Sequence, residues 1–168
     1  MAKPNGCGDL LRALGRGRPD TRTSTTHAHP DTSPPNRMGV LKVLLVKLED
    51  LADKDAIGKT DPYVKLEVIK DGFFDKTVGK AQSSKKQDDC NPVYNEEFSF
   101  HFDELTKMEL HLKIMDDDTI SDDKVGAGEI KLDKEDLQPN LPKTFRIKVD
   151  NNLFSKDAYA TLVLTWTP

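Results

Sequence analysis

Cysteine is scarce in this chain of 168 residues, with Cys7 and Cys90 in two unlike segments. Because no CxxC spacing is present, neither a disulfide framework nor a structural zinc site is expected, and a reducing cytosol is the simpler location. The sequence also lacks an apolar run of the ~20 residues that a membrane-spanning helix needs. The longest candidate, residues 40–48, is interrupted by Lys42 and Lys47. Any membrane contact should therefore be peripheral.

Positive charge and catalytic patterns are also lacking. Residues 38–168 hold 26 acidic and 19 basic side chains, which disfavours general nucleic-acid binding, since that binding depends on neutralising phosphates. The sequence shows no Ser/His/Asp order, no activated cysteine and no phosphate-cradling glycine loop, and no general base accompanies its acidic loops. We therefore expect neither an enzyme nor a nucleic-acid-binding protein.

The first 37 residues differ from the rest in composition. They are rich in Arg, Thr, Pro and Gly, with six basic residues against three aspartates. Such a segment buries too little apolar surface to offset its chain entropy, so we expect residues 1–37 to be a disordered leader and residues 38–168 to form one domain. A transit peptide, or a natural start at Met38, remains an alternative for the leader.

Short strands bounded by turn signals follow from Val40 onward, as in an all-β sandwich. Apolar residues alternate on one face in several of them, for example at Leu110, Leu112 and Ile114. A short helical turn is expected at 133–137. Strands are predicted at residues 40–48, 63–69, 76–83, 97–102, 109–116, 126–132, 144–149 and 158–166.

Two loops concentrate aspartate. Residues 51–63 separate the first two predicted strands, and residues 116–126 separate the fifth and sixth. Calcium takes six to eight oxygen ligands, and carboxylates on irregular loops supply them. Asp116 and Asp118 end a strand at a spacing of two, so both carboxylates can point into one cup. Acidic turns are also common on solvated surfaces, and from spacing alone both interpretations stay open.

The competing calcium motif, the EF-hand, does not fit these loops. Counted from Asp116, the fifth, sixth and twelfth positions are Ile120, Ser121 and Ala127, where an oxygen ligand, glycine and glutamate are required. Counted from Asp118, the third position is Ile120. The flanking segments are also predicted strands, whereas an EF-hand needs helices.

Four segments in order resemble the C2 domains of protein kinase C, synaptotagmin and small plant proteins of the elicitor-responsive and phloem type. They are 58–66 (GKTDPYVKL), 91–100 (NPVYNEEFSF), 112–118 (LKIMDDD) and 123–126 (DKVG). The resemblance extends from about Val40 to Pro168. It implies an eight-stranded antiparallel sandwich of the permuted (type II) topology, with the calcium loops at one end.

The resemblance also implies a set of calcium ligands. Backbone carbonyls would come from Lys54 and Asp117, and Asp122 competes with Asp123 because the second loop is one residue shorter than the common form. The carboxylate ligands that match the family's positions are Asp55, Asp61, Asp116, Asp118 and Asp123.

Calcium on these loops would neutralise a rim that otherwise repels anionic lipid. The sequence therefore predicts a cytoplasmic, calcium-dependent module that docks reversibly on anionic phospholipid. Ile57 and Ile120 at the loop tips would insert shallowly into the membrane, or alternatively pack the loops. A lysine patch, with Lys76 and Lys80 on one strand face, would bind headgroups or else protect a solvated edge. The patch comprises Lys76, Lys80, Lys85 and Lys86.

The alternative function is a protein–protein interaction module in which the aspartates are structural or hold calcium without lipid. His101 and His111 both point away from the apolar faces and are expected to be cross-strand neighbours. Two histidines of this kind indicate a solvated pair rather than a metal site.

Overall fold

The computed structural model describes residues 38–51, 60–117, 123–150 and 157–168. The expected leader, residues 1–37, lies outside these ranges. One short 3-10 helix, η1 (Leu132–Lys134), follows the sixth strand, close to the predicted helical turn. The strands are β1 (Gly39–Glu49), β2 (Pro62–Lys70), β3 (Lys76–Gln82), β4 (Val93–Phe102), β5 (Met108–Asp116), β6 (Asp123–Lys131), β7 (Lys143–Val149) and β8 (Ala158–Thr167).

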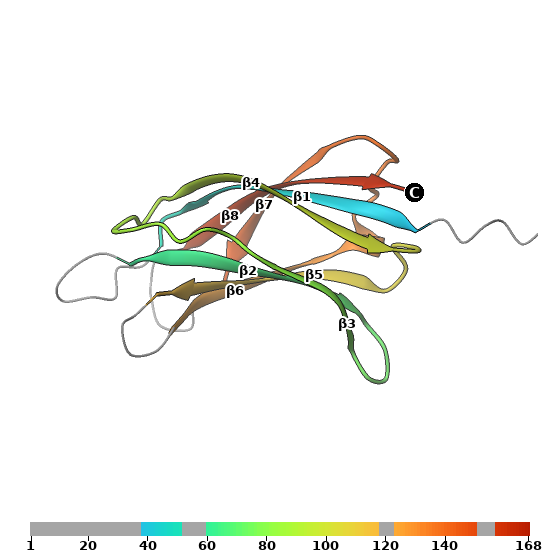
Figure 1. Cartoon of the computed structure of the whole chain (residues 1–168), viewed down its shortest axis with the longest axis horizontal. Helices are drawn as coiled ribbons and strands as arrows, with labels where there is room; N and C mark the ends of the chain where they lie inside the picture. The colour runs from blue at the N-terminus through green and yellow to red at the C-terminus, as the bar shows by residue number, and fades with distance from the viewer. Residues whose placement is uncertain (1–37, 52–59, 118–122, 151–156) are drawn as a thin grey trace, which may run out of the picture. The chain divides into compact units, whose positions relative to one another are not determined.

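The strands form two four-stranded antiparallel sheets that face each other (Figure 1). One sheet has the order β4-β1-β8-β7, and the other has the order β3-β2-β5-β6. The first and last strands, β1 and β8, lie side by side in the first sheet. Circular permutation requires ends that lie this close together. The predicted all-β, eight-stranded antiparallel sandwich is confirmed.

The core lies between the sheets and follows the alternation seen in the sequence. Leu110, Leu112 and Ile114 of β5 are fully buried, as are Leu162 and Leu164 of β8. These side chains point inward because successive residues of a strand face opposite sides. The residues of β5 that alternate with these buried side chains point the other way, to the outer face of the β3-β2-β5-β6 sheet. That outer face carries polar side chains.

The two histidines expected to be cross-strand neighbours lie on different sheets. His101 of β4 pairs with Val40 of β1, whereas His111 of β5 pairs with Glu67 of β2 and Glu129 of β6. The expectation was wrong because β4 and β5, although consecutive in sequence, belong to different sheets. The chain crosses from one sheet to the other between them.

Within the described ranges, no helix combines the length and the apolar character needed to cross a bilayer.

Candidate functional site

The ends of three strands meet at one end of the second sheet. Pro62, the first residue of β2, pairs with Asp116, the last residue of β5, and Asp116 pairs with Asp123, the first residue of β6. Each of these strand ends borders one of the aspartate-rich loops. The fold therefore brings the described ends of the two loops together, and the place where Asp61, Asp116 and Asp117 meet is called the rim below.

Hydrogen bonds connect Asp61 directly to the end of β5. The Asp61 backbone N–H donates to Oδ1 of Asp116 at 2.8 Å, and the Asp117 N–H donates to the Asp61 carbonyl at 3.1 Å. The Asp116 side chain is only 2% exposed. A carboxylate held so far from water needs hydrogen bonds or a cation to offset its desolvation.

A third segment, residues 86–89, closes against the same strand end. The Asp88 N–H donates to Oδ1 of Asp61 at 2.8 Å, and the Asp89 N–H donates to the Thr60 carbonyl at 3.1 Å. Asp88 has a φ of 51°, in the left-handed region that aspartate tolerates better than most residues. The Asp61 carboxylate is therefore oriented by the backbone N–H of Asp88.

The carbonyl of Pro62 anchors the base of this rim. It accepts hydrogen bonds from the Lys86 N–H at 3.1 Å and from the Tyr94 hydroxyl at 2.8 Å. Burial raises the pKa of Tyr94 well above its usual value, so the phenol stays protonated and able to donate. Tyr94 belongs to the segment 91–100 that carries the family resemblance, and its role here is to hold β2 in place.

The rim carries a cation of its own. Nζ of Lys85 lies 2.5 Å from Oδ1 of Asp117, and 5.7 Å from the centre of the Tyr63 ring. The Asp117 carboxylate is thus engaged by a lysine. This contact is compatible with a ligand role for Asp117 through its backbone carbonyl alone, which was the predicted role.

The carboxylates of Asp61 and Asp116 fit a calcium ion. Both offer the hard carboxylate oxygens that calcium prefers as ligands. Both also lie next to chain segments that contain more aspartate. Six predicted site residues lie outside the described ranges, and the side chain of Asp123 is not described. The six are Lys54, Asp55, Ile57, Asp118, Ile120 and Asp122.

The four predicted lysines do not form one patch. A register shift opposite Val68 and Ile69 places Lys80 across from Glu67 but Lys76 across from Lys70. Residues that pair directly across two strands face the same side of the sheet. Glu67 faces outward, whereas Lys70, three positions along β2, faces the other side. Lys80 and Lys76 therefore lie on opposite faces of β3. Their predicted common face was therefore wrong. Lys85 and Lys86 follow the other end of β3 from Lys76.

Sequence reasoning missed a shallow cavity on the outer face of the second sheet. The cavity has a volume of about 430 Å³, and three lysines, Lys65, Lys80 and Lys113, line it together with Glu67. Nζ of Lys80 and of Lys113 lie 3.0 and 3.7 Å from the Glu67 carboxylate. The alternation of β2 and β5 contained the signal, since Lys65 and Lys113 occupy outward positions and are paired in register.

Solved structures with the same fold include C2 domains. The C2A domain of a plant extended synaptotagmin 1 superimposes with a TM-score of 0.66 at 24% identity, covering 77% of this chain and 95% of that one. The calcium-bound C2A and C2B domains of extended synaptotagmin 2 superimpose with a TM-score of 0.57 at 26% identity, covering 76% of this chain and 45% of that one.

Curated relatives include synaptotagmin-2 of Arabidopsis thaliana, 34% identical over 71% of this chain and 21% of that protein. The chain spans about a fifth of the length of the first curated relatives that it matches. The family model of the C2 domain matches residues 39–147, which include both sides of the rim around Asp61 and Asp116. This chain belongs to the C2 domain family.

Proposed function

We propose that this protein is a calcium-dependent module that docks reversibly on anionic phospholipid. The observation that carries the proposal is the joining of Asp61 to Asp116, which brings two aspartate-rich loops together at one rim. The remaining carboxylate ligands would come from Asp55, Asp118 and Asp123. All three belong to segments that begin or end within a few residues of this contact.

The charge around the rim supports this mechanism. Without a cation, carboxylates gathered here disfavour one another and any approaching phosphate, by on the order of a few kcal/mol per close pair at an effective dielectric near 20. Bound calcium would supply positive charge and open coordination positions for phosphate oxygens. Asp61 and Asp116 would hold the ion with little movement, because backbone N–H groups already orient their carboxylates.

Two lysines at the rim would add contacts to the lipid. Lys85 forms an ion pair with Asp117, and Nζ of Lys86 lies 5.3 Å from the centre of the Tyr94 ring. A lysine close to an anionic surface contributes about 1 kcal/mol to binding. In the cytoplasm, docking would then depend on calcium for its switch and on these side chains for part of its strength.

The cavity around Glu67 offers a second contact for lipid headgroups. Lys65, Lys80 and Lys113 surround one carboxylate there, so positive charge prevails and suits phosphate. The C2 resemblance implies the same use for a lysine-rich face on these strands. Lys76 belongs to the other face of β3 and would take no part.

The similarity to extended synaptotagmin 2 adds support. The structure of its C2A and C2B domains is that of a calcium-bound protein, and this chain is 26% identical to it. This relative therefore holds calcium on the same fold.

One observation favours the alternative, a protein-interaction module with structural aspartates. The Asp116 side chain already accepts a hydrogen bond from the Asp61 N–H, which joins the start of β2 to β5, and the Asp61 side chain accepts one from the Asp88 N–H. In that case the carboxylates stabilise the fold, and the domain works without calcium.

Co-sedimentation with phosphatidylserine-containing liposomes separates the two functions. The full chain is spun with liposomes in calcium or in chelator, alongside Asp116→Asn. Asparagine keeps the shape and the oxygen that accepts the Asp61 N–H but removes the charge. Asp103→Asn is the matched control, because this exposed aspartate follows the far end of β4.

We expect the wild type and Asp103→Asn to pellet only with calcium, and Asp116→Asn to stay in solution. A second control, Phe73→Ser/Phe74→Ser, removes two exposed rings from the β2–β3 hairpin at the opposite end of β2 (Figure 1). Pelleting of this variant should be unchanged. If the wild type pellets equally with calcium and with chelator, or does not pellet under any condition, the proposal is wrong and the alternative is favoured.

A further inference from the structure

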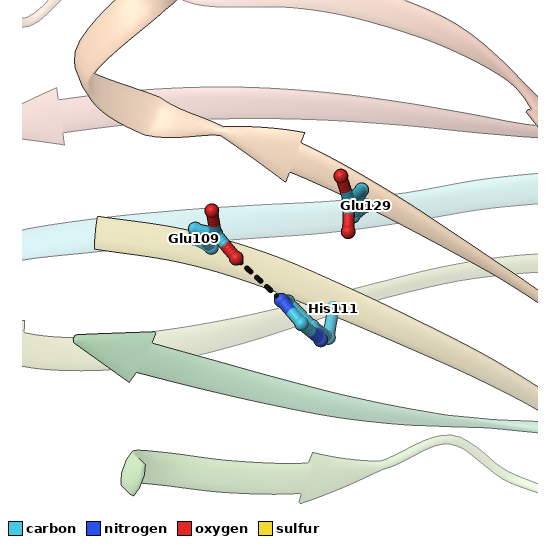
Figure 2. Close-up of side chains that lie close together, drawn as sticks. All are labelled: Glu109, His111 and Glu129. Carbon is cyan, nitrogen blue, oxygen red and sulfur yellow. Dashed lines mark hydrogen bonds and ion pairs between the residues drawn. The ribbon is translucent and has the colours of Figure 1, made fainter. Parts of the chain in front are cut away.

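A mixed cluster of metal-binding side chains lies on the outer face of the second sheet, away from the rim. Glu109 and His111 are two residues apart on β5, and Glu129 is the residue of β6 directly opposite His111. Figure 2 shows the three side chains on adjacent strands, with Glu109 turned toward the imidazole. The cluster arises from the alternation of β5, since both residues occupy outward positions on either side of the buried Leu110.

The distances suit a single small cation. Nε2 of His111 lies 2.8 Å from Oε2 of Glu109, and one ligand atom from each of the three residues lies within 4.8 Å of the others. Zinc bonds of about 2.0–2.2 Å in a tetrahedral site put ligand atoms roughly 3.3–3.5 Å apart. Nε2 of His111 and Oε2 of Glu109 must therefore move apart by about half an ångström, and the exposed Glu129 side chain must turn toward them.

The ligand types distinguish this cluster from the calcium site. An imidazole nitrogen with two carboxylates suits zinc, whereas calcium prefers oxygen alone and more ligands. Asp116 lies five residues further along β5 than His111, roughly 17 Å at the rise of a strand. It also has the inward parity of Leu112 and Ile114, whereas His111 faces outward.

The surroundings would hold the ligands and leave one coordination position open. Nζ of Lys131 lies 3.4 Å from Oε1 of Glu109, so one oxygen of this carboxylate is oriented by a lysine while the other faces His111. Metal-binding carboxylates are commonly held in this way. His111 and Glu129 also line a cavity of about 530 Å³, which Lys124 and Lys148 border. A fourth ligand, water or a small anion, can enter from that cavity.

We propose that Glu109, His111 and Glu129 form a zinc-type site on the outer face of β5 and β6, separate from the calcium rim.

Imidazole ¹⁵N NMR of the full chain tests this site, because it observes the four histidines separately. The metal-free protein is titrated with zinc, and then with calcium. We expect the ring nitrogens of His111 to shift with zinc and stay unmoved by millimolar calcium, while those of His101 respond to neither. Removing one ligand should weaken zinc binding at His111 by at least about tenfold, since even partners outside the ligand set contribute 10–100-fold.

The variants are Glu129→Gln and Glu109→Gln, with His101→Gln as the matched control. Asp116→Asn should lose calcium-dependent pelleting with liposomes and keep zinc binding at His111, so failure of this proposal can be told apart from failure of the calcium proposal. A His111 ring unmoved by zinc would overturn the inference, even if His27 or His29 responds. An unchanged zinc affinity at His111 in Glu129→Gln or Glu109→Gln would overturn the three-ligand site.

Discussion

The backbone N–H of Asp61 donates a 2.8 Å hydrogen bond to Oδ1 of Asp116, joining residues 55 positions apart in the chain. The bond forms when β2 pairs with β5, so the same pairing that builds the sheet also builds the rim. Asp61 and Asp116 are therefore held in place by the fold itself, and the proposed calcium ion would have little ordering to do at these two residues. Ligand side chains that are already in place lose less conformational entropy on binding, so more of the interaction free energy appears as affinity.

Calcium should raise the melting temperature of the full chain. A ligand that binds only the folded state stabilises it by about 2.7 kcal/mol at 100 times its dissociation constant. For a domain of this size, we expect a rise on the order of 5–10 °C. Differential scanning calorimetry in calcium and in chelator measures it, with the Asp103→Asn variant as control. An unchanged melting temperature at millimolar calcium would show that the rim is acidic surface that does not bind calcium.

Lys85→Gln should bind calcium more tightly than the wild type. Lys85 places a positive charge beside Asp117 at the rim, and that charge opposes a divalent cation. Removing a charge at this distance in partly exposed surroundings is worth on the order of 1 kcal/mol, or about fivefold in affinity. Calorimetric titration checks this effect.

The same variant should bind anionic liposomes more weakly at saturating calcium, because a lysine that contacts phosphate is lost. Lys134→Gln is the matched control, since Lys134 is exposed and follows the far end of β6. If calcium affinity falls in Lys85→Gln, the lysine supports the site rather than opposing the ion.

Gly126→Ala should destabilise the fold near the rim. An added Cβ would lie 2.3 Å from Cγ1 of Val149 and 3.2 Å from the carbonyl oxygen of Asp150. Val149 is buried and Asp150 bonds to Ala127, so neither neighbour moves freely. We expect a loss of about 1–3 kcal/mol in the free energy of unfolding by urea.

Gly72→Ala is the control for this substitution, because an added Cβ there meets only the Phe74 carbonyl oxygen at 3.5 Å. Its effect should stay within about 0.5 kcal/mol. Equal losses in both variants would show that the loss of glycine itself, rather than the contact with β7, determines the cost.

Glu67 should contribute stability at neutral pH that disappears in acid. The Thr77 hydroxyl, at 2.6 Å, and Lys80 hold the pKa of Glu67 below its ordinary value of 4.5. Because the folded-state pKa is the lower one, folding favours the ionised carboxylate. The stabilisation is present above pH 4.5 and is lost as the pH falls through the folded-state pKa.

Glu67→Gln should therefore be less stable than the wild type at pH 7, with the difference shrinking as the pH drops below 4.5. Urea unfolding at several pH values measures the difference. Glu104→Gln serves as control, because Glu104 is more exposed and lies 3.8 Å from its lysine. A difference between Glu67→Gln and wild type that stays constant across this range would contradict the assignment.

Most of the fold could be predicted from the sequence because inward residues alternate so regularly. The β5 pattern of Leu110, Leu112 and Ile114 has its expected fully buried face. The start of β4 was missed, since that strand begins at Val93 and not at residue 97. Glu96 occupies the same side of the strand as Phe98 and the buried Tyr94, and this charged residue interrupts the apolar alternation that would have extended the strand to Tyr94.

The site could be predicted less completely. Loop-end aspartates such as Asp61 and Asp116 stand out because strand-end spacing and family motifs both mark them. The lysine face could not be predicted, because a register shift after Val68 reverses the sides on which Lys76 and Lys80 lie. The neighbours of His111 were also hidden, since Glu129 reaches it through pairing across strands.

Calcium titration without lipid, by isothermal calorimetry on the full chain, tests the central claim most directly. The wild type should bind at least one calcium ion, and Asp116→Asn should lose most of that binding while keeping its fold. Asp103→Asn should bind as the wild type does. Wild-type protein that takes up no calcium at millimolar concentration, or Asp116→Asn that binds undiminished, would contradict the account.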